Sequence, residues 1–272
     1  MGRYIIAADI AGLPTLATTG GNRMTAAAVT VRAGLADEVR AIARSLPKWR
    51  DANEAIAAQA IELIERSALA VGIASMTKPP GAWEDFFAAA KPLQDAIVAQ
   101  DRSPAGFAKP ANVAKFVLLC HAYTLGMTQA IKVERDTHIK DLFGLDLIES
   151  TIVCDTEIEG EENLAAFRSF WTRSDEHQPR IRSLGIRTVT KEVIVTSEQD
   201  EPLLRLADFA AGIAHCALIP EPGRIKMPLE HETAKRLLGR LNATGKLALV
   251  NQPFDAKYEE IFGEAMAAAR EQ

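Results

Sequence analysis

Three aspartates placed at or within apolar segments are the residues of this chain best suited to chemistry. Asp9 follows the run YIIAA, Asp155 follows TIVC, and Asp208 lies within LLRLADFAAGIA, which is apolar nearly all round. A carboxylate in such surroundings is costly unless it is exposed, capped or bound to a cation. Mg²⁺ and Mn²⁺ prefer hard oxygen ligands, and a pair of such ions can activate a water for phosphodiester cleavage. The three acids are therefore candidate metal ligands and catalytic residues, with Mg²⁺ or Mn²⁺ as the cofactor.

Each acid also has an ordinary structural explanation. Asp9 could close its strand with an Asx turn, and Asp155 could serve a turn or cap a following helix. Asp208 could pair with Arg205, one turn earlier on the same predicted helix. An ion pair in an apolar helix carries a large desolvation penalty, so a functional reason for Asp208 deserves weight.

Other chemistry finds less support in the sequence. Glu157 is either a solvated loop acid or a fourth carboxylate for the same site. The five histidines show no zinc-binding spacing, and no phosphate loop, nucleophile elbow or dinucleotide-binding glycine motif is present. Cys120, Cys154 and Cys216 lie in apolar runs without a CxxC pair, which indicates buried reduced thiols.

The elements that must position these acids form an α/β pattern. Residues 3–9 and 24–32 predict an antiparallel hairpin, because β-branched and apolar runs flank a turn-rich segment. Further strands are expected at 69–76, 147–155 and 188–196. Helical periodicity predicts helices over residues 35–46, 52–67, 82–100, 110–135, 160–172, 201–217, 229–241 and 255–270. The order of these elements indicates a mixed sheet flanked by helices.

Composition sets the broad class. The chain has 272 residues with 48% hydrophobic and 25% charged residues, which allows a sizeable core. No apolar run approaches the ~20 residues that span a bilayer, and no signal peptide is recognised, so a cytoplasmic protein without a membrane partner is expected. A net charge of −5 argues against a protein coated in nucleic acid but allows a local basic groove. The Pro- and Gly-rich segment 219–228 predicts a boundary between a domain over 1–218 and a helical extension over 219–272 packed on it.

Three segments together resemble the domain-of-unknown-function 3800 family. These are AADIAG near the N-terminus, TIVCD in the middle and SEQDEPLLRLADFAAG in the second half. Members of the family open with Asp-Glu-Ser-Gly and close with a strand ending in Ser, then a helix reading Leu-Gln-Leu-Ala-Asp-Leu-Leu-Ala-Gly. The resemblance covers roughly residues 3–218, and the LADFAAG helix is its most specific part.

The resemblance implies a ribonuclease H-like domain in which Asp9, Asp155 and Asp208 share one site. It also assigns two substrate-binding residues. Ser197 matches the family's serine on the late strand, and Lys78 matches a lysine often found after the strand LAVGIASM. Nucleic acid is the partner that this fold and these acids imply, by analogy.

Two departures from the family pattern leave two hypotheses open. Ile10 and Ala11 replace the family's Glu and Ser after the first Asp, and Arg205 replaces its Gln, placing a cation one turn from Asp208. The first hypothesis is a metal-dependent nuclease or phosphodiesterase, with Glu157 supplying the missing carboxylate. The alternative is a catalytically decayed ribonuclease H-like protein that binds or regulates.

Overall fold

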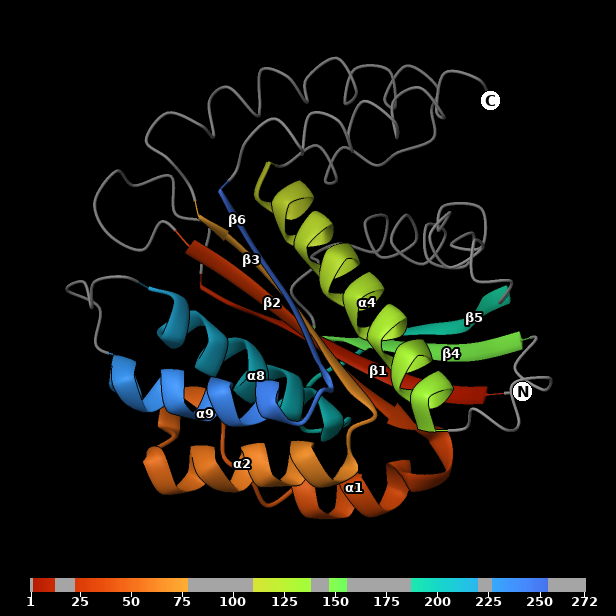
Figure 1. Cartoon of the computed structure of the whole chain (residues 1–272), viewed down its shortest axis with the longest axis horizontal. Helices are drawn as coiled ribbons and strands as arrows, with labels where there is room; N and C mark the ends of the chain where they lie inside the picture. The colour runs from red at the N-terminus through yellow and green to blue at the C-terminus, as the bar shows by residue number, and fades with distance from the viewer. Residues whose placement is uncertain are drawn as a thin grey trace.

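The computed structural model describes residues 2–12, 23–77, 110–137, 147–155, 187–219 and 227–253, and these form a six-stranded mixed sheet with helices on both faces (Figure 1). The strands are β1 (Gly2–Ala11), β2 (Arg23–Arg32), β3 (Ala70–Thr77), β4 (Leu147–Cys154), β5 (Arg187–Val195) and β6 (Leu247–Pro253). The helices are α1 (Ala36–Ala43), α2 (Glu54–Ser67), α4 (Pro110–Thr137), α8 (Leu203–Leu218) and α9 (His231–Ala243), with short 3-10 turns η1 (Ala33–Leu35) and η2 (Trp49–Asp51).

The sheet has the order β5-β4-β1-β2-β3-β6. β2 runs antiparallel to β1 and β3, whereas the β1–β4, β4–β5 and β3–β6 pairs are parallel. β1 lies inside the sheet, with the antiparallel pair β2 and β3 on one side and the parallel strands β4 and β5 on the other. The predicted α/β fold class is therefore confirmed.

Most predicted elements agree with the structure to within a few residues. The hairpin of β1 and β2, the strands β3, β4 and β5, and the helices α1, α2, α4, α8 and α9 all lie where the patterns indicated. The helices expected at 82–100, 160–172 and 255–270 lie outside the described residues. β6 was not predicted, and it extends the sheet beside β3 rather than adding another helix. None of the helices in the described part of the chain has the length and apolarity to cross a membrane.

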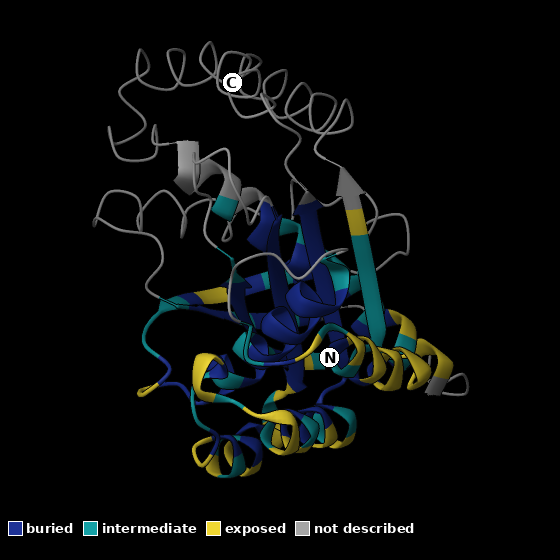
Figure 2. Cartoon of the chain, turned by 90° about the vertical axis from the view of Figure 1, so that its left-hand side faces the viewer, coloured by how far each residue is buried: buried dark blue, intermediate teal, exposed yellow. Residues whose placement is uncertain are grey.

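Two apolar layers fix the sheet between its helices. Successive side chains of a strand point to opposite faces. Ala7 of β1 and Ala27 of β2 therefore belong to the core that α1, α2, α8 and α9 share. Ile6 and Ala8 belong to the core under α4. Figure 2 shows the middle of the sheet buried and an edge strand only partly buried, with many exposed residues on the outer helices.

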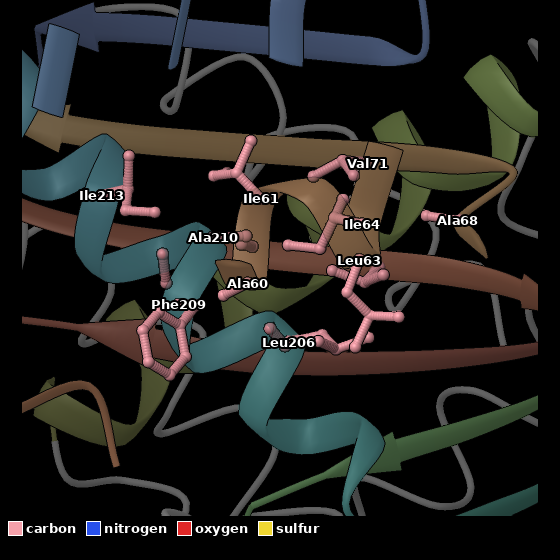
Figure 3. Packing of buried hydrophobic residues seen from close by; sticks show 14 of the residues in the cluster. Ala60, Ile61, Leu63, Ile64, Ala68, Val71, Leu206, Phe209, Ala210 and Ile213 are labelled. Atoms are coloured by element: carbon pink, nitrogen blue, oxygen red, sulfur yellow. The ribbon is translucent and has the colours of Figure 1, made fainter. Parts of the chain in front are cut away.

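Helix α8 is the central packing element on its face of the sheet. Leu206, Phe209 and Ile213 lie in one cluster with Ile61 and Ile64 of α2 (Figure 3). Full burial of a side chain of this size contributes about 1.5–3 kcal/mol. Because α8 packs against β1, β2, α1, α2 and α9, a side chain on α8 reaches both the sheet and the outer helices.

Candidate metal centre

Asp9 lies near the end of β1 and points toward α8. It pairs across the hairpin with Ala27 and is two residues beyond Ala7, whose side chain packs in the core under α8. The residue is only 5% exposed. Its Oδ1 accepts a hydrogen bond from the backbone N–H of Ile10 at 2.7 Å. The strand therefore delivers a buried carboxylate to the interface between the sheet and α8.

Asp208 faces the same interface from the middle of α8. Its helix is apolar nearly all round because both its sides are covered, so Asp208 is an exception among buried neighbours. Oδ2 accepts a hydrogen bond from the backbone N–H of Trp49 at 2.9 Å. A buried carboxylate needs such donors. The donor comes from η2, in the connection between α1 and α2.

Glu198 is a further acid at this interface and is buried like Asp9, although no sequence pattern predicted it. It lies in the turn after β5, where the N–H groups of Asp200 and Glu201 both donate to the carbonyl of Ser197. Glu198 is 6% exposed, and its Oε1 pairs with the ammonium of Lys48 at 3.2 Å. Its Oε2 is buried and has no hydrogen-bond partner among the residues that the structure describes. Such an orphaned charged oxygen is costly.

These three acids form one cluster. One carboxylate oxygen from each of Asp9, Glu198 and Asp208 lies within 4.8 Å of the others. Like charges this close disfavour one another's ionisation unless a cation is present. Their oxygen chemistry is what Mg²⁺ or Mn²⁺ prefers, so the cluster can hold a divalent metal. We call Asp9, Glu198 and Asp208 the acid cluster.

The pKa of Asp208 reflects the burial and the neighbouring charges of the acid cluster. Burial raises the pKa of Asp208 from 3.8 to about 6, although the Trp49 N–H opposes the shift. The neighbouring Glu198 and Asp155 raise the pKa further, and Lys48 lowers it. A bound divalent cation would favour the ionised form instead.

The predicted ligand Asp155 lies near the acid cluster but outside it. It follows directly on β4, the strand beside β1, and its charge acts on Asp208. The three carboxylates that share a 4.8 Å group are those of Asp9, Glu198 and Asp208. Its role as a ligand stays a prediction.

Of the three remaining predicted site residues, the structure describes one. Ser197 begins the turn that carries Glu198, and its Oγ donates to Oδ2 of Asp200 at 2.9 Å. Its hydroxyl thus stabilises the turn, and a role toward substrate stays a prediction. Glu157 and Lys78 lie outside the described residues.

Arg205 does not pair with Asp208. Its guanidinium donates to the backbone carbonyls of Arg44 and Leu46, just after α1. The Arg205–Asp208 pair that the sequence left open as an explanation of this acid is therefore not formed in the described part of the chain. The cation at the acid cluster is Lys48, far away in sequence.

Glu198 could have been found from one signal. It directly follows Ser197, which the family resemblance had already singled out, at the end of a strand beside β4. In the polar string SEQDE it reads as a solvated turn acid. Its burial depends on Lys48, which no local pattern connects with it.

No family model matches the chain, and no curated protein matches it. Among solved structures, the chain is similar to a chain in the structure of the PCNA:RNase HII complex from Archaeoglobus fulgidus. The two share 13% identity, the match covers 99% of this chain and 91% of that chain, and the TM-score is 0.37. A TM-score of this size carries no inference about the activity of this chain.

Proposed function

We propose that this protein is a divalent-metal-dependent nuclease or phosphodiesterase whose acid cluster holds the ion. The observation that carries the proposal is the convergence of Asp9, Glu198 and Asp208 within 4.8 Å, where Asp9 and Glu198 are buried and Asp208 is half-buried. An isolated buried carboxylate is already costly, and three together are costlier still. A divalent cation removes most of that cost.

The residues fit Mg²⁺ or Mn²⁺ in both chemistry and valence. All three donors are hard carboxylate oxygens, and no sulfur or imidazole lies in the group. The buried Oε2 of Glu198 has no hydrogen-bond partner in the described part of the chain and is an oxygen available to a cation. Bound there, such an ion supplies Lewis-acid catalysis of phosphodiester hydrolysis.

The protein's own groups orient the carboxylates. The Trp49 N–H fixes Oδ2 of Asp208, and the Ile10 N–H fixes Oδ1 of Asp9. Both donors belong to the backbone of ordered elements, so each carboxylate is held without a flexible partner. Preorganised ligands of this kind reduce the reorganisation needed when the ion and substrate bind.

Nucleic acid is the proposed substrate class, and Asp155 is the proposed further ligand. Both rest on the family resemblance, in which the first acid, the acid after the central strand and the helix acid serve one site. The charge of Asp155 already acts on Asp208, which supports a place beside the acid cluster.

A second candidate function is a binding or regulatory protein with a decayed metal site. The pairing of Lys48 with Glu198 favours it, because an ammonium already neutralises part of the acid cluster. In this case the cluster is a structural ion network, and it needs no metal to be stable.

The experiment is Mn²⁺ titration by calorimetry, followed by cleavage assays on RNA, single-stranded DNA and duplex DNA. The variants are Asp9→Asn, Glu198→Gln and Asp208→Asn, and Asp37→Asn is the matched control because the Asp37 side chain is 97% exposed. We expect metal binding and cleavage to fall at least about tenfold in the three variants and to stay unchanged in the control.

Cleavage that survives all three substitutions would remove the acid cluster from the mechanism. Mn²⁺ binding without cleavage of any of these nucleic acids would favour the binding protein. Failure to bind Mn²⁺ at all would reject the metal site itself.

A further inference from the structure

Arg23 is a buried cation on the same face of the sheet as the acid cluster. It opens β2, and the residue is 8% exposed. A single nitrogen, Nη1, donates to Oγ of Ser75 at 3.0 Å and to Oδ1 of Asn251 at 2.6 Å. No carboxylate forms an ion pair with Arg23 among the residues that the structure describes. A guanidinium carries five donors, so most of its capacity is left over.

A chain of hydroxyl groups links Arg23 to His215. Ser75 and Thr25 are hydrogen bonded at 3.0 Å, and Oγ1 of Thr25 lies 3.4 Å from Nδ1 of His215. Thr25, Ser75 and His215 are all buried. Ser75 also donates to the carbonyl of Met24 at 3.4 Å, so the Ser75–Thr25 and Thr25–His215 contacts can run in either direction and fit either tautomer of His215. His215 offers an N–H at Nε2 in the tautomer that accepts from Thr25 at Nδ1.

Gly12 closes this cluster on the side of β1. Its φ of +88° lies in the left-handed region. A Cβ there would come within 2.6 Å of the Arg23 carbonyl oxygen and 2.7 Å of Cε1 of His215. Only glycine allows the chain to pass so close, so the backbone is folded tightly around the two basic residues.

The charge of this cluster is unbalanced as far as the described residues show. Burial lowers the pKa of Arg23, and burial together with the charge of Arg23 lowers the pKa of His215 to about 4. At neutral pH, His215 is therefore uncharged and the cluster carries the single positive charge of Arg23. A buried charge without a counter-charge is expensive for the fold. A ligand that brings a negative charge would remove this cost and would explain why the buried Arg23 is present.

We propose that Arg23, His215, Thr25, Ser75 and Asn251 form a binding site for a phosphate group. The unused N–H groups of Arg23 and the Nε2–H of His215 donate to the phosphate oxygens, while the two hydroxyls and Asn251 hold the donors in place. Arg is well suited to this, since its planar fork matches phosphate geometry.

The phosphate site is separate from the acid cluster. His215 follows Asp208 by two turns on the same face of α8, which corresponds to about 10 Å along the helix. It uses none of the acid-cluster residues and requires no metal. The phosphate site can therefore exist whether or not the proposed nuclease activity does.

The test is phosphate binding by the full chain in the presence of EDTA. Inorganic phosphate is titrated, and binding is followed by the melting temperature and by the imidazole NMR signals of His215, assigned with His215→Gln. We expect a saturable rise in melting temperature and a shift of the His215 signal, with little shift at His231, which bonds a backbone carbonyl elsewhere. A 5′-phosphorylated and an unphosphorylated dinucleotide then show whether a nucleotide phosphate binds more tightly than the free ion.

Two variants in the phosphate site and one control variant separate binding from folding. Arg23→Met is expected to weaken phosphate binding at least about tenfold, and Arg50→Met, at a side chain 78% exposed, leaves it unchanged. Asn251→Asp places a carboxylate beside Nη1 of Arg23. We expect it to raise the melting temperature without ligand and to abolish the response to phosphate.

The proposal is overturned if phosphate leaves both the melting temperature and the His215 signal unchanged. It is equally overturned if Asn251→Asp binds phosphate as well as the unaltered protein does. Because metal is absent, neither result depends on whether the acid cluster is catalytic.

Discussion

The backbone N–H of Trp49 donates to Oδ2 of Asp208 at 2.9 Å, and the indole of the same residue lies against Gly212, one turn further along α8. The ring of Trp49 also meets Phe209 edge-on, with centroids 5.7 Å apart and an interplanar angle of 81°. The Trp49 side chain thus packs η2 against α8. This packing holds in place the backbone N–H of Trp49, which orients the carboxylate of Asp208.

Gly212→Ala should therefore disturb the acid cluster through Trp49. A Cβ at Gly212 collides with the indole of Trp49. The Trp49 residue must then shift, and its backbone N–H moves away from Asp208. We expect a loss of about 1–3 kcal/mol in the free energy of unfolding, together with weaker Mn²⁺ binding. Urea denaturation and calorimetry measure the two effects.

Gly239→Ala is the matched control for that experiment. Gly239 lies inside α9, and nothing lies within 4 Å of a Cβ built there. Alanine should stabilise this position by about 0.5–1 kcal/mol, because it is the better helix former. A neutral or stabilising Gly212→Ala would contradict the close contact with Trp49.

Asp208 and His215 should give opposite dependences of stability on pH. The pKa of Asp208 is about 6 in the folded protein and 3.8 ordinarily, so acidification through this window favours the folded state. The pKa of His215 is about 4 in the folded protein and 6.5 ordinarily, so acidification between 6.5 and 4 favours the unfolded state. Each effect is worth up to about 3 kcal/mol.

Substituting one of these two residues should leave the pH dependence of stability that the other residue causes. Between pH 6.5 and 4, His215→Gln is expected to gain stability relative to the unaltered protein, whereas Asp208→Asn is expected to lose it. Urea denaturation at pH 7, 5.5 and 4.5 in the presence of EDTA measures both. Parallel curves for the two variants would show that burial does not shift these groups as described.

Lys48→Met should strengthen metal binding. Lys48 neutralises Glu198 and competes with a cation for that carboxylate. Because the lysine is 43% exposed, its removal should raise Mn²⁺ affinity by only about twofold to fivefold. Lys235→Met, which removes an exposed ion pair with Glu232 on α9, is the control. A weaker affinity in Lys48→Met would mean that the lysine positions Glu198 rather than opposing the metal.

Gly72→Ala should be far more damaging than Gly126→Ala. A Cβ at Gly72 of β3 meets the backbone of Ala122 and Gly126 in α4, and backbone cannot step aside. A Cβ at Gly126 lies 3.3 Å from the Ala28 carbonyl and Oγ1 of Thr30, which is tight but tolerable. We expect a loss of more than about 3 kcal/mol for the first and about 1 kcal/mol for the second, measured by urea denaturation.

The sequence predicted the parts of this fold that short-range patterns encode. The apolar run before Asp9 and the apolar helix around Asp208 marked β1 and α8, because an acid in such a context stands out. β6 was missed since LALVNQP is short, and its described side chains are half-buried or exposed at the edge of the sheet.

Long-range partners could not be predicted. Lys48 and Glu198 are separated by 150 residues, and the sequence offers no pattern that joins them. A pair between Arg205 and Asp208 was one of the open explanations of this acid because the two share a helix, yet Arg205 donates instead to backbone carbonyls just after α1. The buried position of Arg23 depends on β3 and β6, neither of which is adjacent to it in sequence.

The acid cluster draws its members from β1, from the turn after β5 and from α8, while its backbone donor Trp49 is 159 residues from Asp208. Contacts between such distant segments form late and slowly in folding. During synthesis, Asp9 leaves the ribosome long before Asp208. The hairpin of β1 and β2 therefore lacks the helix that covers one of its faces until α8 has been made. Any metal affinity of this site therefore belongs to the finished chain, and no nascent or truncated form that ends before α8 can possess it.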